Sequence, residues 1–288
     1  MRRYGAQMAG LLALVPGMAL AEEPPAQSPS PASPHWELSL GASYSDGSYD
    51  ALEKTYVTAF PVSLRYANEG LWVRVMVPYV ILRGPANLLD APQPFGAGGR
   101  FNPGGGELDG AMTIPRGAVV PGDPLPISSR ADGLGDVALT LGYRFDLGDL
   151  THLSFSTRLK LPTARVSDGL GTGKADLILG GDLTRDIGPA MVTVGLRHRF
   201  TGEPEAMVLR DTWSLDGNVA WRIGGHRLVG LDYEWRQSVV PGNPVSNDLT
   251  AWTSLPLIRA TRIDLYGGTG IGRGGAALLG GAALRWKF

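Results

Sequence analysis

Apolar and polar residues alternate along most of the chain from residue 35 onward. In the segment TYVTAFPVSLRY (55–66), Phe60, Val62 and Leu64 share one phase, and Ser63 falls in the other. Successive side chains of a β-strand point to opposite faces, so this period of two predicts strands with one apolar face. No stretch of the mature chain shows a convincing apolar period of 3.6 residues. The pattern therefore predicts an all-β fold.

The alternating segments number about twelve, and the tenth and eleventh alternate least regularly. Each is bounded by turn-forming residues, as expected of strands. The predicted strands cover residues 35–45, 55–66, 71–82, 133–145, 152–161, 174–184, 191–200, 212–223, 227–237, 248–257, 262–270 and 276–288.

The connections between these strands alternate in length. The short ones are 67–70, 146–149, 186–189, 224–225 and 258–261, whereas the others are mostly longer and rich in Gly and Pro. Short turns at one rim and long loops at the other are typical of outer-membrane barrels. The sequence thus predicts a transmembrane antiparallel β-barrel of about twelve strands, with short periplasmic turns and long extracellular loops.

Aromatic residues in the apolar phase support a membrane barrel over a secreted soluble barrel or sandwich. They gather near the two predicted rims, as a bilayer with two interfaces requires, and a soluble fold has no reason to sort them in this way. The group next to the long loops is Tyr44, Tyr56, Tyr79, Phe200, Trp213 and Trp235, and the group next to the short turns is Trp36, Tyr66, Tyr143, Phe145, Trp221, Trp286 and Phe288.

The first residues have the features of an export signal. Arg2 and Arg3 precede a short apolar stretch, and Ala19–Leu20–Ala21 forms a small-x-small cleavage site. The apolar stretch is too short for a comfortable membrane anchor, the alternative interpretation. We therefore expect a signal peptide at 1–21, a Pro/Ser-rich flexible segment at 22–34 and the barrel at 35–288, in the outer membrane of a Gram-negative bacterium.

The closing strand ends in phase on a large aromatic residue. Trp286 and Phe288 are predicted to face lipid, whereas Arg285 and Lys287 face the lumen. Outer-membrane barrels commonly end in such an aromatic, so we expect Trp286 and Phe288 to be an assembly signal for the barrel-assembly machinery. The other expected partners are outer-membrane lipid, lipopolysaccharide and a small-molecule solute.

The opposite phase of the strands supplies candidate lumen residues. Eleven basic and seven acidic side chains are predicted to point inward; besides the candidates named next, they include Arg144, Arg199, Arg222, Arg285, Lys287 and Asp264. They form either a cross-strand ion-pair network or a slightly cationic pore that favours anions, and both can hold. The candidate lining residues are Arg65, Arg74, Asp136, Arg158, Lys160, Asp176, Asp182, Arg197, Asp216, Asp232, Glu234 and Arg236.

The longest connection, 84–132, contains ten Gly and eight Pro residues. Loops of this length are usually functional or disordered. We expect an extracellular loop over the pore mouth that either forms a constriction or remains a mobile cap. The constriction candidates are Arg83, Phe95, Arg100 and Phe101.

Composition argues against several other functions. The 26 Lys+Arg against 27 Asp+Glu lack the basic surplus of nucleic-acid binders, and the chain has no cysteine for disulfides, thiolate metal sites or catalysis. Its four histidines show no metal-site spacing, and GIGRGG (270–275) precedes a strand rather than the helix of a dinucleotide site. His198 has no recognisable triad partners. We expect no cofactor, no metal and no enzymatic activity.

Three segments resemble a known family. GLGDVALTLGYRF (133–145), RLKLPTARVSDGLGTGKADLILGGDL (158–183) and the closing LRWKF are similar to outer-membrane barrels of the MetA-pathway of phenol degradation family. Ala164 departs from the Gly that often follows Pro-Thr in relatives. The resemblance spans roughly residues 55–288 and implies passage of small, often aromatic or hydrophobic, compounds.

The sequence thus favours a channel for passive uptake of small molecules. The alternatives are a structural or surface-interaction barrel with a blocked lumen and, less favoured, an outer-membrane hydrolase.

Overall fold

The computed structural model describes residues 34–47, 54–84, 130–165, 170–205, 208–224, 226–258 and 260–288. The predicted signal peptide, the Pro/Ser-rich segment except its last residue and most of loop 84–132 lie outside the described residues. Within these ranges no helix is long and apolar enough to cross a membrane.

The described part of the chain forms antiparallel strands at the predicted places, including the weakly alternating tenth and eleventh. The strands are β1 (His35–Gly47), β2 (Thr55–Asn68), β3 (Leu71–Arg83), β4 (Arg130–Leu134), β5 (Val137–Asp146), β6 (Thr151–Leu161), β7 (Asp176–Ile187), β8 (Ala190–Phe200), β9 (Thr212–Arg222), β10 (Leu228–Arg236), β11 (Ser246–Ile258), β12 (Thr261–Gly270) and β13 (Leu278–Lys287).

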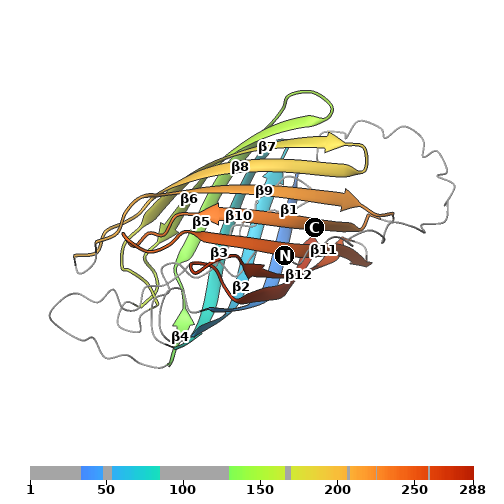
Figure 1. Ribbon diagram of the computed structural model, residues 1–288. Coiled ribbons are helices and arrows are strands. Elements are labelled where there is room, and N and C mark those ends of the chain that lie inside the picture. The colour runs from blue at the N-terminus through green and yellow to red at the C-terminus, as the bar shows by residue number, and fades with distance from the viewer. Residues whose placement is uncertain are drawn as a thin grey trace, which may run out of the picture. The chain divides into compact units, whose positions relative to one another are not determined.

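The sheet closes on itself into a barrel (Figure 1). Except at β4 and β5, each strand pairs with its sequence neighbours, β1 also pairs with β13, and the β2–β3 pairing completes the ring. β4 and β5 both pair with β3, at its two ends, so they are two parts of one barrel strand. The thirteen segments therefore make a twelve-stranded barrel, and closure removes the unpaired edges that hydrocarbon cannot solvate.

The strand predicted at 133–145 begins earlier than expected and is interrupted. Arg130, Ala131 and Asp132 belong to β4, so the prediction that the long loop extends to residue 132 is wrong at its last three positions. The interruption at Gly135–Asp136 separates β4 from β5. The additional strand residues pair with β3, as Ala131 does with Leu82. This pairing joins residues that are distant in the sequence.

The two rims of the barrel differ as predicted. One rim, here called the short-turn rim, carries the connections 69–70, 147–150, 188–189, 223–227 and 259–260. The other, the long-loop rim, carries 48–54, 84–129, 162–175, 201–211, 237–245 and 271–277. Both ends of the barrel sequence lie at the short-turn rim, where the backbone amide of Trp36 donates to Phe288 at 2.8 Å and that of Phe288 to Trp36 at 2.9 Å.

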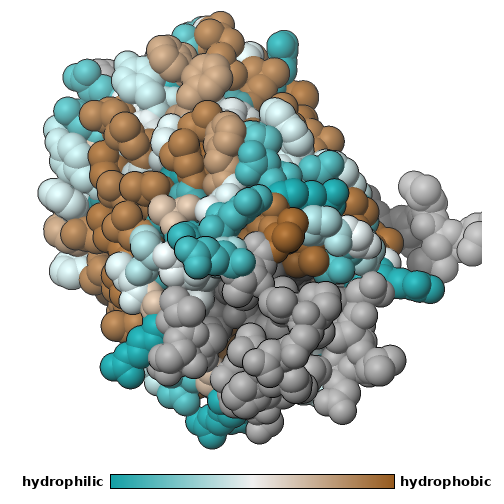
Figure 2. Space-filling view, turned by 90° about the vertical axis from the view of Figure 1, so that its left-hand side faces the viewer, coloured by the Kyte–Doolittle hydropathy of each residue, from teal (hydrophilic) through white to brown (hydrophobic). Residues whose placement is uncertain are grey.

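The outer face of the barrel is apolar. The exposed fractions of Leu139, Leu177, Val194 and Leu231 are 39%, 36%, 53% and 47%. In Figure 2, hydrophobic side chains cover much of the left and upper wall. The predicted aromatic groups face outward near the rims, although Tyr66 and Trp235 are half-buried. An outer surface of this kind would be unstable in water, because large apolar patches favour association with other apolar surfaces.

Adjacent residues of one strand provide a direct test of the strand phases. Cysteines placed at Leu139 and Val194 should react with a lipid-soluble maleimide in bilayers, whereas cysteines at the buried neighbours Thr140 and Thr193 should react much less. The natural chain has no cysteine to interfere. Equal labelling of the two pairs, measured by mass spectrometry, would contradict the assigned faces.

Candidate functional site: the barrel lumen

The twelve candidate lining residues lie on the inner face of their strands. Asp182 and Arg236 are partly exposed, and the other ten side chains are buried. Two further bases that were predicted to face inward are exposed instead. Arg222 is 48% exposed and pairs with Asp186 at the short-turn rim, and Lys287 is also exposed. The inner wall is thus charged, whereas the outer wall is apolar.

Lys160 is the centre of a buried cluster near the long-loop rim. Its ammonium lies 3.4 Å from Asp136 and 3.1 Å from Asp176, and it donates to the Thr172 hydroxyl at 3.2 Å. Asp176 also pairs with Arg199 and accepts a hydrogen bond from the Gly202 amide at 2.9 Å. This cluster fastens the connection 162–175 to the barrel wall.

The interruption between β4 and β5 belongs to the same cluster. Asp136 accepts a hydrogen bond from the Ala164 amide at 2.8 Å, and the Thr163 hydroxyl accepts one from the Val137 amide at 2.8 Å. Two of the segments that carry the family resemblance therefore meet in space, through residues 133–136 of one and residues 160–164 and 170–176 of the other. Nothing in their sequence spacing predicts this contact.

Two further ion-pair groups continue the network across β7 to β11. Arg197 pairs with Asp216 and, at 3.1 Å, with Asp182. Arg236 lies 3.6 Å from Glu234 and 3.9 Å from Asp248. The cross-strand network, one of the two interpretations of the inward charges, is therefore present in the long-loop half of the lumen.

A cavity of about 80 Å³ lies against this wall, on the inner face of β6 to β10. Its ionic lining consists of Arg158, Lys160, Arg197, Arg199 and Arg236 together with Asp176 and Glu234. Each of the acids Asp136, Asp182, Asp216 and Asp248 pairs with one of these bases from outside the lining. The bases of the cavity are thus largely compensated, and their number alone does not make it an anion site.

The short-turn half of the lumen is organised differently. Arg65 of β2 and Arg74 of β3 are buried and stand directly opposite each other, and both guanidinium groups lie over the Trp72 ring, at 5.3 and 5.5 Å from its centroid. Nearby, Arg285 donates to Asp264 at 2.8 Å and lies 3.8 Å from Glu37. Cations predominate here, whereas acids match the bases nearer the long loops.

Two indole rings lie flat against glycines of the neighbouring strand. Trp72 is paired with Gly142, and Trp252 with Gly230. A Cβ atom at Gly142 would lie 2.3 Å from the Trp72 ring, and one at Gly230 would lie 2.4 Å from the Trp252 ring. Only glycine permits this approach, so each ring is held against the wall.

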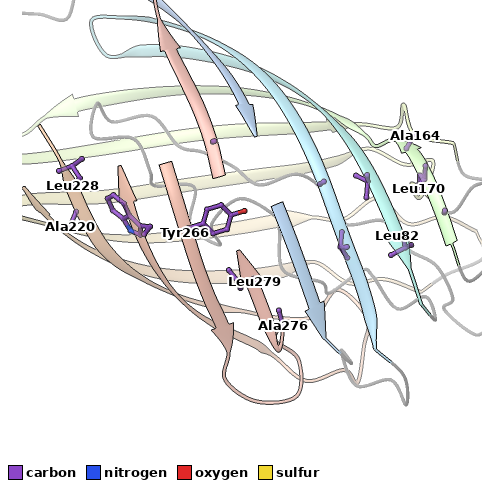
Figure 3. Close-up of a cluster of buried hydrophobic side chains, with 14 residues drawn as sticks. Leu82, Ala164, Leu170, Ala220, Leu228, Tyr266, Ala276 and Leu279 are labelled. Carbon is purple, nitrogen blue, oxygen red and sulfur yellow. The ribbon is translucent and has the colours of Figure 1, made fainter. Parts of the chain in front are cut away.

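Apolar side chains line another part of the inner wall. Figure 3 shows Leu82, Ala164 and Leu170 together at one end of the barrel and Leu228 and Ala220 at the other, with Tyr266 and Leu279 between them. Val57, Ala59 and Val80 extend the first group over β2 and β3. The lumen is therefore amphipathic, whereas the residues predicted from the sequence to line it were all charged.

Of the four constriction candidates, Arg83 lies within the described residues. Arg83 is exposed at the end of β3, in phase with outward-facing Tyr79, so its predicted turn toward the lumen is not observed. Phe95, Arg100 and Phe101 lie outside the described residues. The inward acids Glu37 and Asp248 were missed, although alternation with Trp36 and Leu249 marks both as inward.

Two of the described histidines make structural contacts. His198 packs against Phe200 and Trp213 in the outer aromatic group, with ring centroids 4.5 and 4.3 Å apart, and His152 lies 2.6 Å from Asp146. Within the ranges that the structure covers, no group of three or more histidine or acidic side chains is placed to hold a metal ion.

Comparison with solved structures identifies the fold. An outer membrane channel from Pseudomonas putida F1 matches with a TM-score of 0.59 and 12% identity, over 93% of this chain and 100% of that chain. The chain has the fold of an outer-membrane β-barrel. The KdgM porin matches with a TM-score of 0.50 and 9% identity, over 88% of this chain and 99% of that chain.

A third match is not described as a porin or channel. The translocator domain of the autotransporter NalP from Neisseria meningitidis has a TM-score of 0.50 and 9% identity, with 89% of each chain covered. No family model matches the chain, and no curated protein matches it. The resemblance to the MetA-pathway of phenol degradation family therefore stays a prediction.

Proposed function

We propose that the protein is an outer-membrane channel for the passive uptake of small molecules. The observation that carries this proposal is the inverted arrangement of the closed barrel, with exposed Leu and Val side chains outside and buried charges inside. In hydrocarbon, such a barrel satisfies its backbone internally and provides a polar interior. The short turns then face the periplasm and the long loops the exterior.

The chemistry of the inner wall supports a solute with apolar parts. The strip formed by Val57, Ala59, Val80, Leu82 and Leu170 adjoins ionic residues in the same lumen. An aromatic or hydrophobic compound with one polar group matches such a wall, because each part contacts side chains of its own kind. This agrees with the solutes implied by the MetA-like resemblance.

Reconstitution of the mature chain into planar bilayers tests the proposal. We expect stepwise conductance increases, and faster swelling of protein-containing liposomes in a small aromatic alcohol than in a sugar. The barrel must first show the heat-dependent gel mobility of a folded outer-membrane protein. A folded barrel that gives neither conductance nor swelling would contradict the channel and favour the alternative below.

The second candidate function is a structural or surface-interaction barrel with a blocked lumen. The ion pairs around Lys160, Arg197 and Arg236 line the long-loop half, and the cavity beside them holds about 80 Å³. Such a space admits only a few water molecules or a very small solute. The same conductance experiment separates the two functions.

The closing strand is proposed to present Trp286 and Phe288 to the barrel-assembly machinery, in a membrane of phospholipid and lipopolysaccharide. Phe288 packs against Trp286, with ring centroids 5.0 Å apart, and exchanges two backbone hydrogen bonds with Trp36. Both contacts lie where β13 meets β1.

Deletion of Phe288 should reduce the amount of folded barrel in the outer membrane, because it removes the aromatic group and both hydrogen bonds. Heat-dependent gel mobility of membrane fractions measures the folded amount. Phe288→Tyr, which keeps the ring and the backbone, is the matched control. Equal folded amounts for the deletion and the natural chain would contradict the assembly role.

A further inference from the structure

Arg65 and Arg74 occupy an arrangement that is unfavourable by itself. They are cross-strand partners on the inner face of β2 and β3, with exposed fractions of 4% and 2%. Like charges directly opposite each other destabilise an antiparallel pair, and burial weakens the screening by water. Their stacking over Trp72 offsets part of this repulsion through cation–π attraction.

The acids of the described residues leave Arg65 without an ion pair. Glu37, its cross-strand partner on β1, lies 3.8 Å from Arg285 instead, and Arg285 also holds Asp264. Arg65 experiences the positive charges of Arg74, Arg144 and Arg285 and a single negative charge, that of Glu37. This differs from the long-loop half, where Lys160, Arg197 and Arg199 each have a carboxylate partner.

Two buried donors at this position lack an acceptor among the described residues. They are Nε of Arg65 and Nε1 of Trp72. A buried donor without a partner costs about 1–3 kcal/mol, so native structures usually supply a water or an ion. The Trp72 ring packs against Gly142, where a Cβ atom would lie 2.6 Å from Nε1.

We propose that Arg65, Arg74 and Trp72 form a binding site for the carboxylate group of small organic acids. This inference rests on the proposed channel function and assigns its solute class. One carboxylate has two oxygens that accept hydrogen bonds from a guanidinium and an indole N–H, and its charge compensates that of Arg65. Its place in the short-turn half puts it on the periplasmic side of the lumen, beyond the paired charges near the long loops.

Binding of sodium benzoate to the folded, detergent-solubilised mature protein tests the site by calorimetry. Arg65→Gln should weaken binding about tenfold or more, because it removes a charge-assisted contact. Trp72→Phe keeps an aromatic ring for the arginines but removes the N–H, and should weaken binding less. Arg222→Gln is the matched control, since it removes one charge from an exposed position at the same rim and should leave the affinity unchanged.

Two further probes separate carboxylate recognition from simpler effects. Benzyl alcohol has the ring without the carboxylate, and sodium chloride supplies an anion without the paired oxygens. We expect benzoate to bind more tightly than either. If Arg65→Gln does not fold, Arg65→Lys keeps the charge and removes the Nε–H, and should also weaken binding.

The outcomes for the site and for the channel are distinguishable. Equal benzoate affinity in Arg65→Gln and Arg222→Gln, or equal affinity of the natural protein for benzoate and chloride, would overturn the carboxylate site. A protein that conducts but does not bind benzoate would overturn this inference and leave the channel intact. Binding with Arg65 dependence but without conductance would overturn the channel and keep the site.

Discussion

Replacing Leu139 or Val194 by arginine is expected to lower the free energy of unfolding by about 2–4 kcal/mol. Both side chains lie in the exposed apolar band of the barrel, away from the rims. A guanidinium there must enter hydrocarbon or draw water into it, and the closed sheet offers no inward route for the side chain. The change affects stability without touching the lumen.

Urea unfolding in lipid vesicles measures this cost. Leu150→Arg is the matched control, because Leu150 is as exposed as Val194 but lies in the short turn 147–150, where the expected cost falls to about 0–1 kcal/mol. A similar small cost at all three positions would mean that the apolar band does not contact lipid.

Asp176→Ala is the second large effect, with an expected loss of about 3–5 kcal/mol. Asp176 is 2% exposed. It forms ion pairs with Lys160 and Arg199 and accepts a hydrogen bond from the Gly202 amide. Its removal leaves the buried Lys160 and the partly buried Arg199 short of a counter-charge and frees the connection beyond β8. Asp176→Asn should cost less, since an amide keeps one hydrogen-bond acceptor.

The exposed pair Asp186–Arg222 provides the comparison for this measurement. Asp186→Ala removes an ion pair of 2.9 Å at the short-turn rim and should cost less than about 1 kcal/mol, because water already solvates the arginine. Unfolding midpoints and slopes in the same vesicles give both values. Equal losses for Asp176→Ala and Asp186→Ala would show that water screens the inner network as strongly as the rim.

The strand phases could be predicted because lipid outside and charges inside impose one strict period of two. Leu139 and Asp136, or Leu231 and Glu234, fall on opposite faces through this period alone. The rims followed from connection lengths in the same way. These features depend on residues close together in the sequence, and a single segment contains enough information to reveal them.

The ion pairs could not be predicted, because they depend on the stagger between strands. Asp176 stands directly opposite Lys160, but Arg197 reaches the diagonal positions Asp182 and Asp216 rather than its register partners Gly180 and Ser214. Alternation assigns a face and leaves the register open. A count of inward charges was therefore compatible with both a cationic pore and an ion-pair network, and the register determines which of these charges pair.

The interruption at Gly135–Asp136 has the same origin. Its hydrogen bonds come from Thr163 and Ala164, which belong to the connection after β6. The strand changes phase at the break, because Leu134 and Leu139 are both exposed although they lie five positions apart. Alternation counted back from Leu139 assigns Leu134 to the inner face, so a single continuous strand pattern does not describe β4 and β5 together. The contact of Trp72 with Gly142 likewise depends on the register between β3 and β5.

Because Trp72 packs against Gly142 and Trp252 packs against Gly230, substitutions at these two glycines should change the width of the lumen. A methyl group at either glycine would occupy the space of the indole, and the backbone behind it is fixed in the sheet. The ring would have to swing away from the wall toward the axis and narrow the passage at that height. Gly142→Ala, Gly230→Ala and the double variant should thus give a series of decreasing pore diameters in the same barrel. Uptake of solutes of increasing width by these variants and by the natural chain would then measure the width of the native pore.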